Sequence, residues 1–167
     1  DLVYRVTNPL ADRVVAVCEA VARRHTGCRA ASRAKLRVIP NCVDCSLFRL
    51  DAKRRAATRD ALGVGSAFVW LAVGRLMWKK DYHTMLRAFA EQRDGVLLVA
   101  GTGPQAEQLR EMGAESGADV RWLGAREDVP ALMNAADGLV LSSVIEGLPV
   151  VLLEAAASGL IAVSTDA

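Results

Sequence analysis

Apolar and polar residues follow two periodic patterns from about residue 60 onward. Short apolar runs predict strands at residues 67–73, 95–100, 119–123, 138–141 and 160–163. Apolar residues at helical spacing predict helices between them, at residues 81–92, 104–115, 129–136 and 149–158. Strands that alternate with helices through short connections are typical of a parallel sheet covered by helices. The pattern therefore predicts an α/β fold with a doubly wound, Rossmann-like parallel sheet.

The first 60 residues are less regular. We expect strands at residues 13–17 and 36–39, a short helix at 19–24, and a helix at 54–62 that Gly63 closes. Pro40 and Asn41 interrupt the pattern, so the following segment, up to residue 51, is the best candidate for a boundary between two parts of the chain.

Composition places the chain among ordinary globular domains, because 52% of its 167 residues are hydrophobic and 24% are charged. No apolar run approaches the roughly 18 residues that a membrane-spanning helix needs, and the first residues do not resemble a signal peptide. We therefore expect a cytoplasmic protein. The chain begins at Asp1 without a methionine and stops directly after an expected strand, so we expect both ends to be cuts within a longer protein.

A net charge of +2 conceals a basic first third, since residues 1–60 hold 13 Lys and Arg against 6 Asp and Glu. Nucleic-acid binding would require aromatic side chains among these charges, and only Tyr4 and Phe48 are available. We therefore expect no nucleic-acid partner. Peripheral contact with an anionic membrane, contact with a missing partner domain and an ordinary solvated surface all remain open.

The four cysteines include one Cys-x-x-Cys pair, formed by Cys42 and Cys45. A structural zinc site would need a second such pair or a histidine cluster, and neither accompanies Cys18 and Cys28. We interpret the cysteines as reduced cytosolic thiols, with redox chemistry at the pair as the alternative.

Glu154 is the only charged residue of the helix expected at 149–158. A carboxylate among apolar residues is costly to bury unless hydrogen-bond donors satisfy it, so we expect a ligand to supply them. Pro149 suits the first helical position and Gly159 the left-handed residue after the last one. This predicts a helix of about ten residues.

Chemistry-bearing residues follow the expected strands at the edge where open α/β sheets bind ligands. They are small residues, cations and a carboxylate: Gly74, Arg75 and Lys80 after the first strand of this region, Gly101 and Gly103 after the second, and Glu146 after the fourth. The amides of Leu148 and Val150 add the positive end of a helix dipole. This combination predicts a bound phosphate or diphosphate, and a sugar or ribose diol would supply the donors that Glu154 needs.

Four motifs, in order along nearly the whole chain, resemble the retaining GT-B glycosyltransferases called family 4, or glycosyl transferases group 1. Residues 11–19 are similar to the family strand A-D-x-V-V-A-V-S-E, with Cys18 where serine is usual. Residues 38–48 are similar to V-I-P-N-G-V-D-x-x-x-F, with Cys42 in place of the glycine. Residues 74–82 resemble G-R-L-x-x-x-K-D-Y, and Glu146 with Glu154 matches the E-x7-E signature, which is the most specific of the four.

The resemblance implies the donor-binding C-terminal half of an enzyme that transfers a hexose from a nucleotide-diphosphate sugar, with retained configuration, to a saccharide or lipid-linked acceptor. It implies that residues 1–45 are the tail of a preceding domain with the interdomain linker, and that residues 46–167 are a nucleotide-sugar-binding domain truncated at its C-terminus. The N-terminal domain, which in this family carries the acceptor site, would be missing. The chain alone would then bind donor without turning it over.

The resemblance also implies roles for individual residues. Arg75 and Lys80 would neutralise the diphosphate as it leaves, and Glu146 would hold the transferred sugar, so these three are the expected catalytic residues. The other expected donor-binding residues are Gly74, Gly101, Gly103, Arg126, Gly147, Leu148, Val150 and Glu154. Arg126 belongs to a turn that would lie against the base. Because family members use protein cations where other transferases use a divalent ion, and no D-x-D motif occurs, no metal or cofactor is expected.

Alternatives to this interpretation are a non-catalytic nucleotide-sugar-binding module and another GT-B enzyme, such as a nucleotide-sugar epimerase. Trp78 lies between the two expected cations, and we expect it to pack within the protein in preference to stacking on a ligand.

Overall fold

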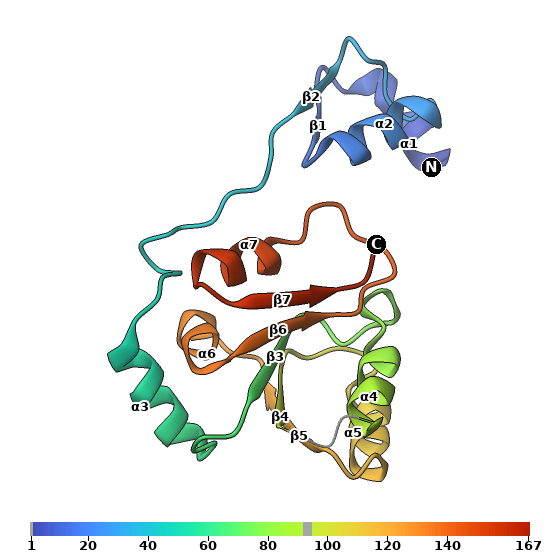
Figure 1. Ribbon diagram of the computed structural model, residues 1–167. Helices are drawn as coiled ribbons and strands as arrows, with labels where there is room; N and C mark the ends of the chain where they lie inside the picture. The colour runs from blue at the N-terminus through green and yellow to red at the C-terminus, as the bar shows by residue number, and fades with distance from the viewer. Residues whose placement is uncertain (1, 92–94) are drawn as a thin grey trace. The chain divides into compact units, whose positions relative to one another are not determined.

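The computed structural model describes residues 2–91 and 95–167, which form two compact units (Figure 1). The first unit comprises the described residues up to Cys42 together with Gly147–Val150. The second unit comprises the other described residues. The assignment of residues 1–45 and 46–167 to two domains of a longer protein stays a prediction.

The first unit contains a pair of parallel strands and short helices. Its elements are α1 (Leu2–Thr7), the 3-10 turn η1 (Asn8–Leu10), β1 (Val14–Ala16), α2 (Glu19–Gly27) and β2 (Leu36–Val38). The strands and the helix expected in this region are confirmed, although α2 extends three residues beyond the expected Arg24. The sequence does not predict α1, because none of its residues is buried and no apolar stripe separates it from a polar face.

The second unit is built on five parallel strands in the order β5-β4-β3-β6-β7 (Figure 1). The strands are β3 (Val69–Val73), β4 (Val96–Ala100), β5 (Asp119–Gly124), β6 (Gly138–Leu141) and β7 (Ile161–Ser164). The helical segments are α3 (Ala52–Leu62), η2 (Trp78–Lys80), α4 (Tyr82–Glu91), α5 (Ala106–Glu115), α6 (Val129–Ala135) and α7 (Val150–Ala157). The predicted α/β fold with a Rossmann-like parallel sheet is confirmed. Gln92, the expected end of the helix at 81–92, lies outside the described residues.

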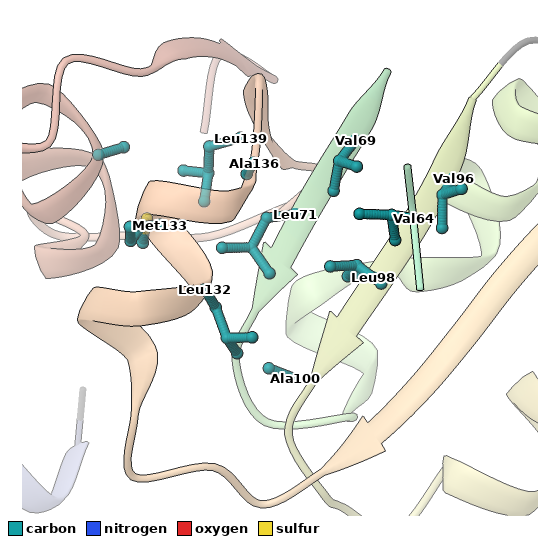
Figure 2. Close-up of a cluster of buried hydrophobic side chains, with 11 residues drawn as sticks. Val64, Val69, Leu71, Val96, Leu98, Ala100, Leu132, Met133, Ala136 and Leu139 are labelled. Carbon is teal, nitrogen blue, oxygen red and sulfur yellow. The ribbon is translucent and has the colours of Figure 1, made fainter. Parts of the chain in front are cut away.

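Side chains of the central strands alternate between two buried layers, as the strand period of two requires. On β3 and β4, Leu71 and Leu98 face a layer completed by α6 and α7, which Figure 2 shows in part. Leu97 on β4 faces the opposite layer, where α4 and α5 pack. In Figure 1, α4 and α5 lie on one side of the sheet and α6 on the other. Central strands buried on both faces explain why they form continuous apolar runs in the sequence.

The strand order reverses next to β3, which pairs with β4 on one side and with β6 on the other. The crossovers from β3 to β5 run toward one edge of the sheet, and β6 and β7 extend toward the other. Loops that leave β3 and β6 at their carboxyl ends therefore diverge, and such a point is where open α/β sheets form a crevice.

Helix α7 is shorter than expected but ends as expected. It begins at Val150, so Pro149 precedes the first helical residue, a one-residue difference of the size common at helix ends. At the other end, Gly159 has φ +74°, and the amides of Gly159 and Leu160 donate to the carbonyls of Ala156 and Ala155. This is a Schellman motif, so the prediction for Gly159 is confirmed.

Helix α3 is fixed to the sheet by two arginines. Its N-cap is Asp51, whose carboxylate accepts from the backbone amides of Lys53 and Arg54. Gly63 closes the helix at φ +60°, as predicted. Arg55 and Arg59 donate to the Asp137 carboxylate over 2.6 and 3.2 Å, and the Val69 amide of β3 donates to it over 2.8 Å. Burial raises the pKa of Asp137, but these donors outweigh it and hold the pKa below its usual value.

Candidate functional site

A cleft of about 660 Å³ lies at the carboxyl ends of β3, β4 and β5. The loops after these strands line it, and they bring together five of the residues selected from the sequence: Gly74, Arg75, Gly101, Gly103 and Arg126. The loops are separated by more than twenty residues along the chain, and only the parallel strand order places them side by side. The cleft lies at the carboxyl-end edge where open α/β sheets bind ligands, but on the β4 side of β3 and not between β3 and β6.

The floor of the cleft is made by two interlocked backbone loops. The Gly74 amide donates to the Ala100 carbonyl over 3.0 Å, and the Leu76 amide donates to the Thr102 carbonyl over 2.9 Å. A Cβ on Gly101, at φ +149°, would overlap the Gly74 carbonyl oxygen, and a Cβ on Gly103 would overlap the Leu76 carbonyl. We expect these small residues, from the sequence, to make room for a ligand, but the neighbouring loop occupies the space that a side chain at Gly101 or Gly103 would need.

Two arginines of the cleft differ in how they are held. Arg75 is exposed and has no ion pair within the described residues of the second unit. Arg126 makes two hydrogen bonds to Asp128, with its Nε and Nη2 at 2.7 and 2.6 Å from the carboxylate oxygens. These hydrogen bonds from Arg126 hold the pKa of Asp128 below its usual value. Arg75 is therefore free to meet an anion, while Arg126 is oriented by its neighbour.

Lys80 and Glu146 form an ion pair beside the cleft. The distance from Lys80 Nζ to Glu146 Oε1 is 2.5 Å, and the two side chains are 23% and 16% exposed. The buried Ser143 hydroxyl donates to the same carboxylate oxygen over 2.7 Å. The Lys80 side chain runs past Gly74, since a Cβ there would lie 3.5 Å from Lys80 Cε. The sequence predicts both residues as site residues but does not indicate that they contact each other.

The start of α4 is anchored to the end of β6. Ser142 lies directly after β6, and its hydroxyl donates to the carbonyls of Lys80 and Asp81 over 2.7 and 2.8 Å. The Tyr82 hydroxyl donates to the Gly74 carbonyl over 3.1 Å. These contacts fix the backbone that carries Lys80, so its ammonium group needs to lose little freedom when it meets a ligand.

Glu154 lies on α7, in the part of this helix that belongs to the second unit. Within the described residues of the second unit, its carboxylate makes no hydrogen bond or ion pair, and its side chain is half-buried. Burial raises the pKa of this carboxyl group above its usual value. A partly buried carboxylate without internal donors is the arrangement that favours hydrogen-bond donors from outside.

The loop from Gly147 to Val150 belongs to the first unit. The Cys18 thiol donates to the Gly147 carbonyl over 3.3 Å, and the Asn41 amide group donates to the Leu148 carbonyl over 2.9 Å. A Cβ on Gly147 would lie 3.1 Å from Val17 Cγ2, so the loop is seated closely on this unit. Within the described residues of the first unit, the Leu148 amide donates to no acceptor.

Trp78 is 58% exposed, so the expectation that it packs within the protein is wrong. It lies in the single 3-10 turn η2, which has no buried residue, and Leu76 two positions earlier fills the core instead. The Lys79 ammonium group lies 5.6 Å from the centre of the Trp78 ring, within the range of a cation–π contact.

In the part of the chain that the structure describes, no three His, Cys, Asp or Glu side chains are grouped so that they could hold a metal ion. No helix among those residues is both long enough and apolar enough to cross a bilayer.

Comparisons with known proteins point to one family. Residues 67–167 match the profile of the family described as glycosyl transferases group 1. EpsF of Bacillus subtilis, whose name assigns it to the glycosyltransferases, is 31% identical over 80% of this chain and 37% of its own length. The GDP-mannose-dependent α-(1-6)-phosphatidylinositol monomannoside mannosyltransferase of Mycolicibacterium smegmatis is 32% identical over 81% of this chain and 41% of its own length.

Among solved structures, Anabaena Alr3699/HepE in complex with UDP-glucose superposes with a TM-score of 0.89 at 26% identity. The match covers 99% of this chain and 48% of that protein. The chain thus spans less than half the length of these relatives, and its fold matches that of GT-B glycosyltransferases. The family profile covers well over half of the chain, so the protein belongs to the glycosyl transferases group 1 family.

Proposed function

We propose that this chain is the donor-binding part of a glycosyltransferase that transfers a hexose from a nucleotide-diphosphate sugar with retained anomeric configuration and without a metal ion. The observation that carries the proposal is the cleft at the carboxyl ends of β3 to β5, where five residues chosen from the sequence line one cavity. A second domain, which would carry the acceptor site, is part of the proposal.

The diphosphate of the donor is assigned to the cations. Arg75 is exposed at the cleft and has no ion pair among the residues that the structure describes in its unit. Lys80 lies beside Gly74 at the edge of the cleft. Two positive charges near the leaving diphosphate would stabilise the charge that develops on it, which is the part of the reaction that a fixed electrostatic site accelerates most. In this proposal the amides of Leu148 and Val150 provide further donors to phosphate oxygens.

The sugar and the nucleoside are assigned to the carboxylates and the glycine-rich floor. Glu146 holds the hydroxyls of the transferred hexose, and Glu154 accepts hydrogen bonds from the ribose hydroxyls. The half-buried carboxylate of Glu154, which has no partner among the described residues of the second unit, supports this role, because ribose supplies two donors to one acceptor group. The floor made by Gly74, Gly101 and Gly103, with Arg126 at its side, accommodates the base.

We infer the chemical class of the donor and of the acceptor from the names of the relatives. Anabaena HepE binds UDP-glucose, and the Mycolicibacterium enzyme is named for GDP-mannose and a phosphatidylinositol mannoside. We therefore propose a nucleoside-diphosphate hexose as donor and a saccharide or lipid-linked saccharide as acceptor. A cytoplasmic location and a peripheral contact with a membrane are part of the same proposal.

Calorimetry on this chain tests the proposal. UDP and GDP are titrated into the wild-type protein, Glu154→Ala and the control Glu111→Ala, which changes an exposed glutamate on α5. We expect one nucleotide to bind, Glu154→Ala to weaken its binding about tenfold and the control to leave it unchanged. Equal affinities for the wild type and Glu154→Ala, or no binding of either nucleotide, would overturn the proposal.

A further inference from the structure

Cys18 occupies the N-cap position of α2 but does not cap the helix. Its backbone is extended, with φ −159° and ψ 166°, and its side chain makes no hydrogen bond to the first amides of α2. A polar side chain at this position ordinarily accepts from those amides. The thiol instead donates to the Gly147 carbonyl, 129 residues away in the sequence. The Cys18 side chain therefore binds the loop before α7 and does not cap its own helix.

Asn41 donates a hydrogen bond to the next carbonyl of the same loop. Its Nδ2 donates to the Leu148 carbonyl over 2.9 Å, across 107 residues of sequence. The loop thus has two consecutive carbonyl groups, each held by a side chain from a separate segment of the first unit. Val17 and Val21 press on Gly147 so closely that a Cβ there would lie 3.1 and 3.3 Å from them.

Because a peptide group is planar, a contact that holds the Gly147 carbonyl also fixes the direction of the Leu148 amide. The peptide bonds of the described residues are all trans, so the carbonyl of Gly147 and the amide of Leu148 point in opposite directions from one planar group. When the Cys18 thiol holds the carbonyl, the Leu148 amide must face away from Cys18. The next peptide ends at Pro149, which has no N–H, so the hydrogen bond from Asn41 fixes that plane without competing for a donor.

We propose that Cys18 and Asn41 are positioning residues for donor binding: they hold two successive carbonyls of the loop and thereby present the Leu148 amide to a phosphate of the nucleotide. This inference rests on the proposed function, in which that amide binds the donor. It assigns a role to two polar side chains of the first unit that donate hydrogen bonds to this loop.

The test compares a variant that keeps a donor at position 18 with one that removes it. Cys18→Ser retains a hydroxyl, whereas Cys18→Ala has none, and Asn41→Ala removes the second donor. Calorimetry with UDP and GDP is expected to show binding about fivefold weaker for Cys18→Ala and for Asn41→Ala, and within twofold of wild type for Cys18→Ser. Unchanged binding in Cys18→Ala, or equal weakening in Cys18→Ser, would overturn the proposal.

A second readout separates this proposal from the proposed function. In the nucleotide-free protein, the Leu148 amide resonance is followed by 15N–1H NMR. We expect it to shift in Cys18→Ala and to return toward the wild-type position in Cys18→Ser, with equal melting temperatures for the two variants. If the wild type binds neither nucleotide, the proposed function fails, and the resonance alone decides whether the thiol orients this amide; an unmoved resonance in Cys18→Ala would refute that orientation.

Discussion

Lys80 and Glu146, 66 residues apart in the sequence, meet in an ion pair of 2.5 Å between the η2 turn and the loop after β6. Both side chains are mostly buried, and Ser143 adds a hydrogen bond to the shared carboxylate oxygen. The charge of Lys80 is therefore compensated before any anion arrives. A phosphate that approaches this ammonium group must compete with Glu146 for it.

Removing the carboxylate charge should therefore strengthen anion binding. We expect Glu146→Gln to bind the preferred nucleoside diphosphate about fivefold more tightly than wild type at low salt, because Lys80 loses its internal partner. Lys80→Ala should bind the same nucleotide about tenfold more weakly than wild type. Calorimetry at low and at high ionic strength checks the first effect, which salt should reduce. Weaker binding by Glu146→Gln would contradict this account of the pair.

Glu154 is expected to cost stability in the absence of a ligand. Burial raises its pKa above the usual 4.5, so the folded protein disfavours the ionised form and the cost appears as the pH rises above that value. Glu154→Gln should therefore be more stable than wild type by about 0.5 kcal/mol at pH 7, a small figure because solvent screens this half-buried group. The gain should vanish near pH 4. Thermal melts across this range check it, with the exposed Glu111→Gln as the variant that should show no such trend.

Gly101 should tolerate no side chain. Gly101→Ala would drive a Cβ into the Gly74 carbonyl at a positive φ, and we expect a loss of about 2 kcal/mol or more in the free energy of unfolding. The matched control is Gly27→Ala at the end of α2, where the added methyl group would meet no atom within 4 Å apart from its chain neighbours and the backbone of its own helix. Urea unfolding should find the control within about 0.5 kcal/mol of wild type. Similar stabilities for both variants would mean that the two loops are not interlocked.

Asp137 should be a strong contributor to stability. Asp137→Asn weakens the contacts with Arg55 and Arg59, and we expect a loss of about 2 kcal/mol at pH 7. Because the folded pKa lies below the usual 3.8, the carboxylate stabilises the fold above that value, and the difference between wild type and variant should shrink as the pH falls below it. Asp119→Asn, which loses an exposed pair with Arg121, should cost less than about 0.5 kcal/mol. A pH-independent difference for Asp137→Asn would argue against this charge effect.

The sequence predicts the sheet of the second unit almost completely, and the reason is local. β3 and β4 are buried on both faces, so their residues form apolar runs that the chain shows directly. Gly63 and Gly159 mark helix ends through backbone angles that few other residues adopt. Helix α1 carries no such signal, because Leu2 and Val3 are exposed in the described structure and no core periodicity marks the helix.

The sequence predicts which strands and loops form the candidate site, but not which side chains contact one another there. Parallel strand order places the residues after β3, β4 and β5 at one edge, so a cleft there follows from the pattern. Side-chain pairing in the site depends on the paths of loops several residues long. Loop paths leave no periodic pattern in the sequence. The contacts of Arg126 with Asp128 and of Cys18 with Gly147 are of this kind. The prediction that Trp78 packs within the protein is wrong for a related reason. Trp78 lies in a one-turn 3-10 helix that has no buried residue, so its side chain has no apolar layer to enter.

The interlocked backbone of the 74–76 and 101–103 loops limits how this cleft can adapt. Neither loop can shift without breaking hydrogen bonds to the other, so a ligand meets a preformed surface and little association energy is spent on reorganising it. Changes in ligand preference within such a scaffold should therefore arise by exchanging side chains around the opening, such as that of Arg75, while the main chain beneath them keeps one shape.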